Sequence, residues 1–235
     1  DMFNNNVLNV LQQINGVTNS VILKYPTTVA VSDSQDMMIN FDVSVVEADE
    51  FPDIPLKDAL GDFLSLFKLF GDKREIEVSG SSIDIKDENI QSSFITHNAA
   101  LMDAWDKSPE QFTKTESVPS VSTFDLGSED IKNISAAMGV FKDLTEVIFT
   151  SQDGDMTISL GATNKFNAKS NTYSIRKPSN ANKEFEIKIP VINFKSLPQT
   201  DYTVDVKYNS ARDSYRILLT SKTLENFKVL MTVKI

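Results

Sequence analysis

The sequence predicts an α+β protein built from two similar halves, each with two helices packed on antiparallel strands. Segments with an apolar period of about 3.6 residues alternate with short β-rich runs of period two. An isoleucine–proline pair recurs at Ile54 and at Ile189, and a three-strand meander follows each pair, starting at Glu75 and at Tyr202. The recurrence of one order of elements predicts an internal duplication.

The first half begins with a helix and a hairpin. Apolar residues at 7, 8, 10, 11 and 14 follow a run of asparagines, which favours a short capped helix. The β-rich runs 20–32 and 37–45 flank a turn, DSQD. A second helix is expected over 54–68, with Pro55 just inside its start, where the missing N–H costs nothing. Strands over 74–80, 82–87 and 90–97 complete this half.

The second half repeats this order. A helix is expected over 127–143 with Ser128 as its cap, followed by a hairpin over 145–162 that turns on Asp153 and Gly154. Strands at 171–176 and 183–189 precede a short helix within 189–198, and strands at 202–208, 214–221 and 226–235 close the chain. Residues 98–121 are polar and contain prolines, which is typical of a surface connector. We therefore expect domains at 1–110 and 122–235, with a connector at 111–121.

Composition narrows the class of protein. The 235 residues suffice for two domains of about 115 residues each. The absence of cysteine excludes disulfides and thiolate chemistry. No apolar run approaches the roughly 20 residues of a membrane span, and no signal-peptide pattern opens the chain, so a cytoplasmic protein is expected. A net charge of −10 argues against binding to nucleic acid, unless the basic residues are gathered on one surface of the protein.

No catalytic, metal or cofactor site is predicted. His97 is the single histidine, and neither a nucleophile elbow nor a phosphate-binding glycine loop is present. The aspartate groups DSQD and DGD lack calcium-loop spacing. A carboxylate pair on a β scaffold stays open, because such a pair is defined in space rather than in sequence.

Lysines gather on one edge of the predicted helices. At about 100° per residue, Lys57 and Lys68 nearly eclipse each other on the 54–68 helix, whereas its aspartates fall on the other flank. Lys132 and Lys142 lie within about 80° of each other on the next helix. The alternative is that each lysine is an ordinary solvated flank residue.

The duplicated order of helix, hairpin, helix and meander resembles the DNA sliding clamp, and most of all the processivity clamp of large tailed phages. Residues 7–33 are similar to the opening helix and hairpin of that family. Residues 185–209 are similar to its stretch before the final strands, with the Lys-x-x-Pro-x-x-Tyr pattern at Lys195, Pro198 and Tyr202.

This resemblance implies a non-enzymatic ring of six repeats, hence a homotrimer of two-domain chains, closed around double-stranded DNA by strand pairing between subunits. The helices would line the channel. The residues expected to face DNA are Lys57, Lys68, Lys132, Lys142 and Lys195. The first helix departs from the family, since it offers Asn5, Asn6, Asn9, Gln12 and Gln13 where relatives often carry lysine.

The resemblance also implies partners: the replicative DNA polymerase, an ATP-dependent clamp loader and late-transcription factors, in the cytoplasm of an infected host cell. Their peptides would enter an apolar groove, with Trp105 and Phe112 either nearby or at a subunit seam. The groove residues expected are Val31, Met37, Val118, Pro119, Val121 and Tyr215. The competing hypothesis is a β-rich structural or adaptor protein, such as a virion component, with no DNA at its centre.

Overall fold

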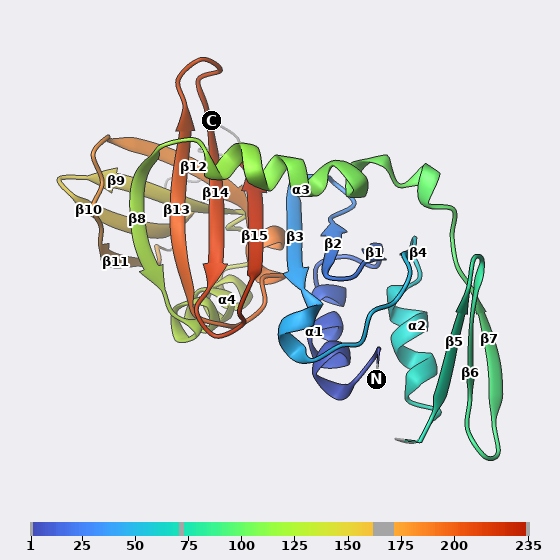
Figure 1. Cartoon of the computed structure of the whole chain (residues 1–235). Coiled ribbons are helices and arrows are strands. Elements are labelled where there is room, and N and C mark those ends of the chain that lie inside the picture. Colours follow the sequence, from blue (N-terminus) through green and yellow to red (C-terminus); the bar gives the residue numbers. More distant parts are fainter. Residues whose placement is uncertain (1, 71–72, 162–171, 234–235) are drawn as a thin grey trace. The chain divides into compact units, whose positions relative to one another are not determined.

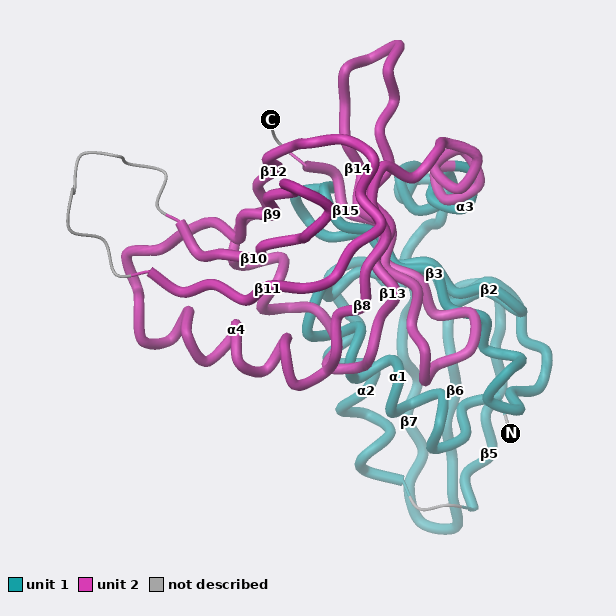
Figure 2. The backbone as a smooth tube through the Cα atoms, turned by 90° about the vertical axis from the view of Figure 1, so that its left-hand side faces the viewer, with its two compact units in different colours: residues 1–110 teal, residues 111–235 magenta. Residues whose placement is uncertain are grey.

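The chain folds as two compact units, residues 1–110 and 111–235 (Figure 2). The computed structural model describes residues 2–70, 73–161 and 172–233. The predicted strand positions 162, 171, 234 and 235 lie outside the described residues. Within the described residues, no helix has both the length and the apolar character that crossing a membrane requires.

Unit 1 contains two α-helices and seven strands among its described residues (Figure 1). Strands β1–β4 form one antiparallel sheet in the order β4-β1-β2-β3, and β5–β7 form a meander. The elements are α1 (Asn5–Asn15), β1 (Val21–Leu23), β2 (Thr27–Val31), β3 (Met37–Asp42), the 3-10 turn η1 (Val43–Val46), β4 (Ile54–Leu56), α2 (Leu60–Phe67), β5 (Glu75–Ser79), β6 (Ser82–Lys86), β7 (Gln91–Ile95) and the 3-10 turn η2 (Ala99–Leu101).

Helix α3 (Asp103–Glu116) runs across the boundary between the units, and unit 2 follows. Two antiparallel sets of strands have the orders β11-β10-β9-β12 and β15-β14-β13-β8. The elements are β8 (Ser120–Leu126), α4 (Ser128–Val140), β9 (Glu146–Gln152), β10 (Asp155–Gly161), β11 (Ser174–Pro178), β12 (Phe185–Pro190), α5 (Val191–Lys195), β13 (Tyr202–Asn209), β14 (Ser214–Ser221) and β15 (Phe227–Thr232).

The strand pairings confirm the predicted α+β duplication. The order β4-β1-β2-β3 in unit 1 matches β12-β9-β10-β11 in unit 2, and each set connects one helix to the next. The meander β5-β6-β7 likewise matches β13-β14-β15. Strand β8, which pairs with β13, has no counterpart beside β5 among the described residues. In both units, a helix is therefore followed by three strands, and a fourth strand then pairs with the first of the three.

The predicted helix over 54–68 is wrong at its start. Ile54, Pro55 and Leu56 form β4, which pairs with β1 and is buried along its whole length. Helix α2 starts only at Leu60. A short apolar run fits a helix and a buried strand equally well, and a proline is tolerated in a strand at the end of a sheet.

The expected connector at 98–121 is also mostly helical. Within unit 1, the Trp105 ring packs against a buried group of Ile22, Val29 and Met102, and its Nε1–H donates to the Ser20 carbonyl at 3.1 Å. Phe112 is buried as well. These apolar residues anchor a helix that is otherwise polar, which explains why its composition resembled a surface connector.

An aromatic cluster holds the centre of unit 1. The Phe3 ring lies 5.4 Å from both Phe63 and Phe67 and 5.3 Å from Phe51, measured between centroids. The Phe63 and Phe67 rings are 4.8 Å apart in an edge-to-face arrangement. The cluster thus joins the segment before α1 to the buried face of α2.

Replacing Phe63 with alanine should lower the free energy of unfolding by about 3–5 kcal/mol, because Phe63 has no exposed surface and its loss leaves a cavity among rings. Urea unfolding followed by circular dichroism measures this change. Leu69→Ala is the matched control, since Leu69 is 62% exposed and should change stability by less than about 0.5 kcal/mol. Equal losses in the two variants would contradict this account of the core.

A distant aspartate caps helix α4. The predicted cap residue, Ser128, is instead the first residue of the helix, and its N–H donates to Asp201 Oδ1 at 2.7 Å. Gly127 N–H donates to Asp130 Oδ2 at 2.9 Å. Hydrogen bonds from Ser128 lower the pKa of Asp201. Two carboxylates thereby satisfy amides at a helix N-terminus, where negative charge is favoured.

The variant Asp201→Ala should lower the urea midpoint, because the α4 amide loses its acceptor. The Asp201 carboxylate has a folded pKa below its unfolded value, so its contribution is present above about pH 4 and is lost as pH falls through the folded pKa. The difference in midpoint between wild type and variant should therefore be full at pH 7 and shrink below about pH 4. A difference that stays constant down to pH 2 would contradict the capping role.

Candidate nucleic-acid interface

Each unit carries a packed pair of helices. In unit 1, α1 packs against α2, and in unit 2, α4 packs against α5. Each helix has apolar side chains on its buried face: Leu11 of α1, Phe63 of α2, Ile134 of α4 and Phe194 of α5. The resemblance to sliding clamps predicts that the outward faces of these helices, with the residues at their ends, face DNA.

The same main-chain link joins the helices of each pair. In unit 1 the carbonyl of Asn19, just after α1, accepts hydrogen bonds from Ala59 and Leu60 at the start of α2, at 2.9 and 3.0 Å. In unit 2 the carbonyl of Thr145, after α4, accepts from Val191 at the start of α5, at 3.0 Å. Helix N-termini have amides without partners inside the helix, so this link satisfies them and fixes where the second helix begins.

The lysines of unit 1 flank α2 rather than sharing one of its faces. Lys57 precedes the helix in the connection from β4, and Lys68 is its C-cap residue. Both are exposed. The backbone after Lys57 is held in place, because Asp58 N–H donates to Ser20 Oγ at 2.8 Å. The predicted eclipse of the two lysines on one helix is therefore wrong.

The lysines of unit 2 are exposed too, and they lie at three different places. Lys132 is on the outward face of α4, Lys142 follows the end of α4 in a turn, and Lys195 is the last residue of α5. A cation at the C-terminal end of a helix is also favoured by the helix dipole, so Lys195 has a structural role independent of any ligand.

The outward face of α1 carries amides only. The residues predicted to replace lysine there are all exposed, whereas Val7 and Val10 of the same helix are buried. Amide side chains can hydrogen-bond a phosphate, and they add no charge. The exposed residues are Asn5, Asn6, Asn9, Gln12 and Gln13.

The Lys-x-x-Pro-x-x-Tyr pattern has a structural explanation. Tyr202 is fully buried, and its hydroxyl donates to the Pro198 carbonyl at 2.9 Å. Burial raises the pKa of Tyr202, so the phenol keeps the proton that it donates. This hydrogen bond closes the turn between α5 and β13. Lys195, the last residue of α5, is exposed just before this turn.

Most of the predicted groove residues do not form a surface together. Val31 and Met37 are 0% and 1% exposed, and the Tyr215 ring packs 5.5 Å from Phe185 and 4.8 Å from Tyr208 within unit 2. Val121 is also buried. These residues sit at core positions of strands, and strand alternation decides which face they take. Val118 and Pro119 alone among the six reach the surface.

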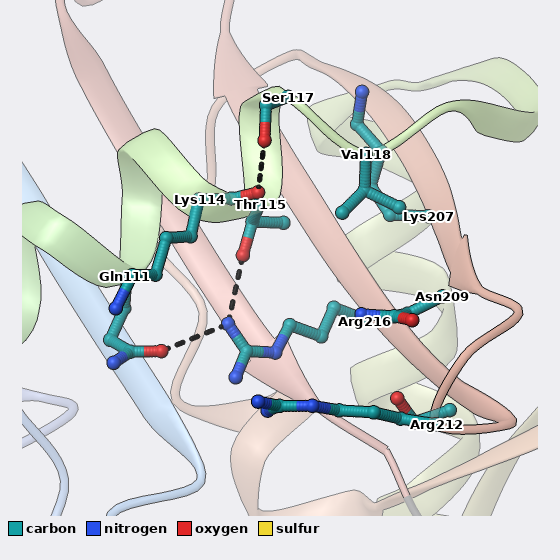
Figure 3. Close-up of a pocket in the computed structure, with 10 residues that line it drawn as sticks. Gln111, Lys114, Thr115, Ser117, Val118, Lys207, Asn209, Arg212 and Arg216 are labelled. Atoms are coloured by element: carbon teal, nitrogen blue, oxygen red, sulfur yellow. Dashed lines mark hydrogen bonds between the residues drawn. The ribbon is translucent and has the colours of Figure 1, made fainter.

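A basic pocket on unit 2 was missed by the sequence reasoning. It gathers Lys114, Lys207, Arg212 and Arg216 with Val118 (Figure 3). The four basic residues come from α3, β13, β14 and the turn between the two strands, and Val118 follows the end of α3. No local pattern joins residues about 100 positions apart, so only the fold reveals them.

Comparison with solved structures finds DNA sliding clamps. The chain superposes on the DNA polymerase III beta chain of Streptococcus pneumoniae with a TM-score of 0.66 at 15% identity, covering 97% of this chain and 63% of that one. It superposes on the A. fulgidus PCNA, solved with the C-terminal region of FEN-1 bound, with a TM-score of 0.64 at 14% identity, covering 97% and 94%.

The PCNA of Entamoeba histolytica gives a TM-score of 0.61 at 9% identity, with coverage of 97% and 94%. The chain thus spans about 63% of the length of the bacterial beta chain and nearly the whole length of the two PCNA chains. No family model and no curated protein sequence matches it. The sliding-clamp fold is therefore established through structure, at identities of 15% or less.

Proposed function

We propose that this chain is a sliding clamp, a ring subunit that encircles duplex DNA and tethers the replicative polymerase during processive synthesis. The observation that carries this proposal is the likeness to clamp structures over 97% of the chain. The clamp acts without catalysis, since enclosure alone retains it on DNA. Its proposed setting is the cytoplasm of a phage-infected cell, with an ATP-dependent loader and late-transcription factors as further partners.

Three copies would close the ring. The chain contains two units and covers 63% of the bacterial beta chain, which is about two thirds of its length. A ring of six repeats therefore needs three copies of this chain. Six of the described strands end a sheet: β4, β5, β7, β8, β11 and β12. Strands β4 and β12 contain Pro55 and Pro190, which cannot donate to a neighbouring strand. We consider β7, which ends the unit 1 meander, and β11, which ends a unit 2 sheet. The edge of β8 is already covered, because Thr123 N–H donates to Asn180 Oδ1 at 2.6 Å. We assign the seam to β7 of one subunit and β11 of the next.

Exposed lysines suit a protein that must slide. The attraction between a lysine and DNA phosphates is long-ranged and independent of base sequence. Such contacts can centre the ring on DNA without fixing it at one site. The five lysines Lys57, Lys68, Lys132, Lys142 and Lys195 are all exposed and lie on or next to three of the four paired helices. Three copies of this set would line the channel.

The partner site is proposed at the surface part of the predicted groove. The A. fulgidus clamp was solved with a C-terminal segment of another protein bound, which supports recognition of short segments by this fold. Here Val118 and Pro119 lie at the surface just after α3, where one apolar anchor from a polymerase peptide could pack.

Replacing Lys132, Lys142 and Lys195 together with glutamine should reduce processive synthesis, because the clamp would lose contacts with DNA phosphates. Each phosphate contact contributes about 0.9 to the slope of log affinity against log salt. The slope for DNA binding should fall by up to about three per chain. The matched control neutralises Lys86, Lys107 and Lys222, which form exposed ion pairs with carboxylates. If both triple variants behave like wild type while the ring stays assembled, the channel assignment is wrong.

Sedimentation and light scattering should give a particle of three chains. Ile95→Asp in β7 should shift the particle towards single chains, because Ile95 is 73% exposed and a charge at a strand edge opposes pairing. Ile90→Asp is the matched control, since Ile90 precedes the strand and is also exposed. A wild-type protein that stays monomeric at high concentration would favour the adaptor hypothesis instead.

A further inference from the structure

A cationic pocket lies on unit 2, between the C-terminal half of α3 and the β13–β14 hairpin (Figure 3). Its volume is about 480 Å³, within the range of small ligand sites. In the described part of the chain, its lining has four basic side chains and no acidic one. The basic residues are Lys114, Lys207, Arg212 and Arg216.

Two of these cations face each other across neighbouring strands. Lys207 of β13 is paired in register with Arg216 of β14. Like charges directly opposite each other destabilise a sheet, so this pair opposes the fold unless an anion lies between the two side chains. Both alternate with the buried residues Val206 and Ile217, which places the two charges on the face of the sheet that turns away from the core.

Arg216 is held in place by neutral groups. Its Nη1 donates to Gln111 Oε1 at 3.1 Å and to Thr115 Oγ1 at 2.9 Å (Figure 3). Burial, and then the like charge of Arg212, lower the pKa of Arg216. The guanidinium is therefore oriented in advance, and its positive charge is not balanced by either of these partners.

The pocket lies on the opposite side of the sheet from α4. Figure 2 shows α4 on one side of the β13–β14 strands and α3 on the other. The pocket is consequently separate from Lys132 and the outward face of α4. No aromatic ring lines it in the described structure, so a nucleobase would find no stacking platform there.

We infer that this pocket binds the carboxylates of an acidic peptide segment from a partner protein. A pre-oriented guanidinium accepts a carboxylate through two parallel N–H···O bonds, and the neighbouring Lys207 and Arg212 supply further charge. Val118 offers an apolar contact at the rim for a residue next to the acid. Val118 also belongs to the proposed partner site, so the inference rests on that part of the proposed function and adds the charge of the segment that binds.

The test is fluorescence anisotropy with the full chain and a labelled peptide of alternating glutamate and glycine. Wild type should bind it in a saturable, salt-sensitive manner, and the glutamine–glycine peptide should not bind. Lys207→Gln with Arg212→Gln should weaken binding about tenfold or more. These two side chains make none of the Arg216 hydrogen bonds, so the fold should remain intact, as circular dichroism would confirm.

The control is Lys107→Gln, which removes one positive charge from α3 outside the pocket and should bind like wild type. Arg216→Lys keeps the charge but loses the planar fork, and it should weaken binding as well. Three results would overturn the inference: no saturable binding of the glutamate peptide, equal loss in Lys107→Gln, or binding of inorganic phosphate or a single-stranded oligonucleotide through these residues in place of the peptide.

Discussion

The arrangement of each unit depends on one main-chain link, the hydrogen bond from the start of the second helix to the carbonyl that follows the first. Helix α5 has only five residues and α2 only eight, and helices this short do not persist alone in water. Capping by Asn19 and Thr145, together with burial of one face, makes these short helices stable. Because the link recurs in both units, it also shows that the helix pairs are equivalent.

Local patterns in the sequence predicted the elements that local physics controls. The apolar period of α1 and α4 and the Asp153–Gly154 turn were sufficient to place two helices and a hairpin. The strand β4 was misread because three buried apolar residues carry no period. Helix α3 was missed because its stability comes from contacts such as that of Trp105 with Ser20, 85 residues away.

The candidate site shows the same division. Exposure of all five lysines followed from the polar flanks of the helices, whereas their exact places depended on helix ends that no local signal marks. The cap from Asp201 to Ser128 spans 73 residues, and the basic pocket joins α3 to β14 across about 100 residues. Long-range pairing of this kind is a property of the fold, and sequence patterns do not report it.

The two basic regions differ in the kind of cation they use. Lysines alone flank the helices, whereas the pocket on the other side of the unit 2 sheet adds two arginines, of which Arg216 is held by Gln111 and Thr115. A hydrated ammonium forms loose contacts that exchange readily, whereas a guanidinium held by two neighbours suits a defined anion. A chain with a net charge of −10 therefore carries two groups of cations that differ in kind.

The amide-only face of α1 has a consequence for any rod enclosed by copies of this chain. Within each copy of unit 1, the outward face of α1 would present no net charge to an enclosed rod, whereas Lys57 and Lys68 beside α2 would attract an anionic one. Because this attraction is uneven, the enclosed rod would move towards one group of cations at a time. The rod would then lie off the central axis of the hole.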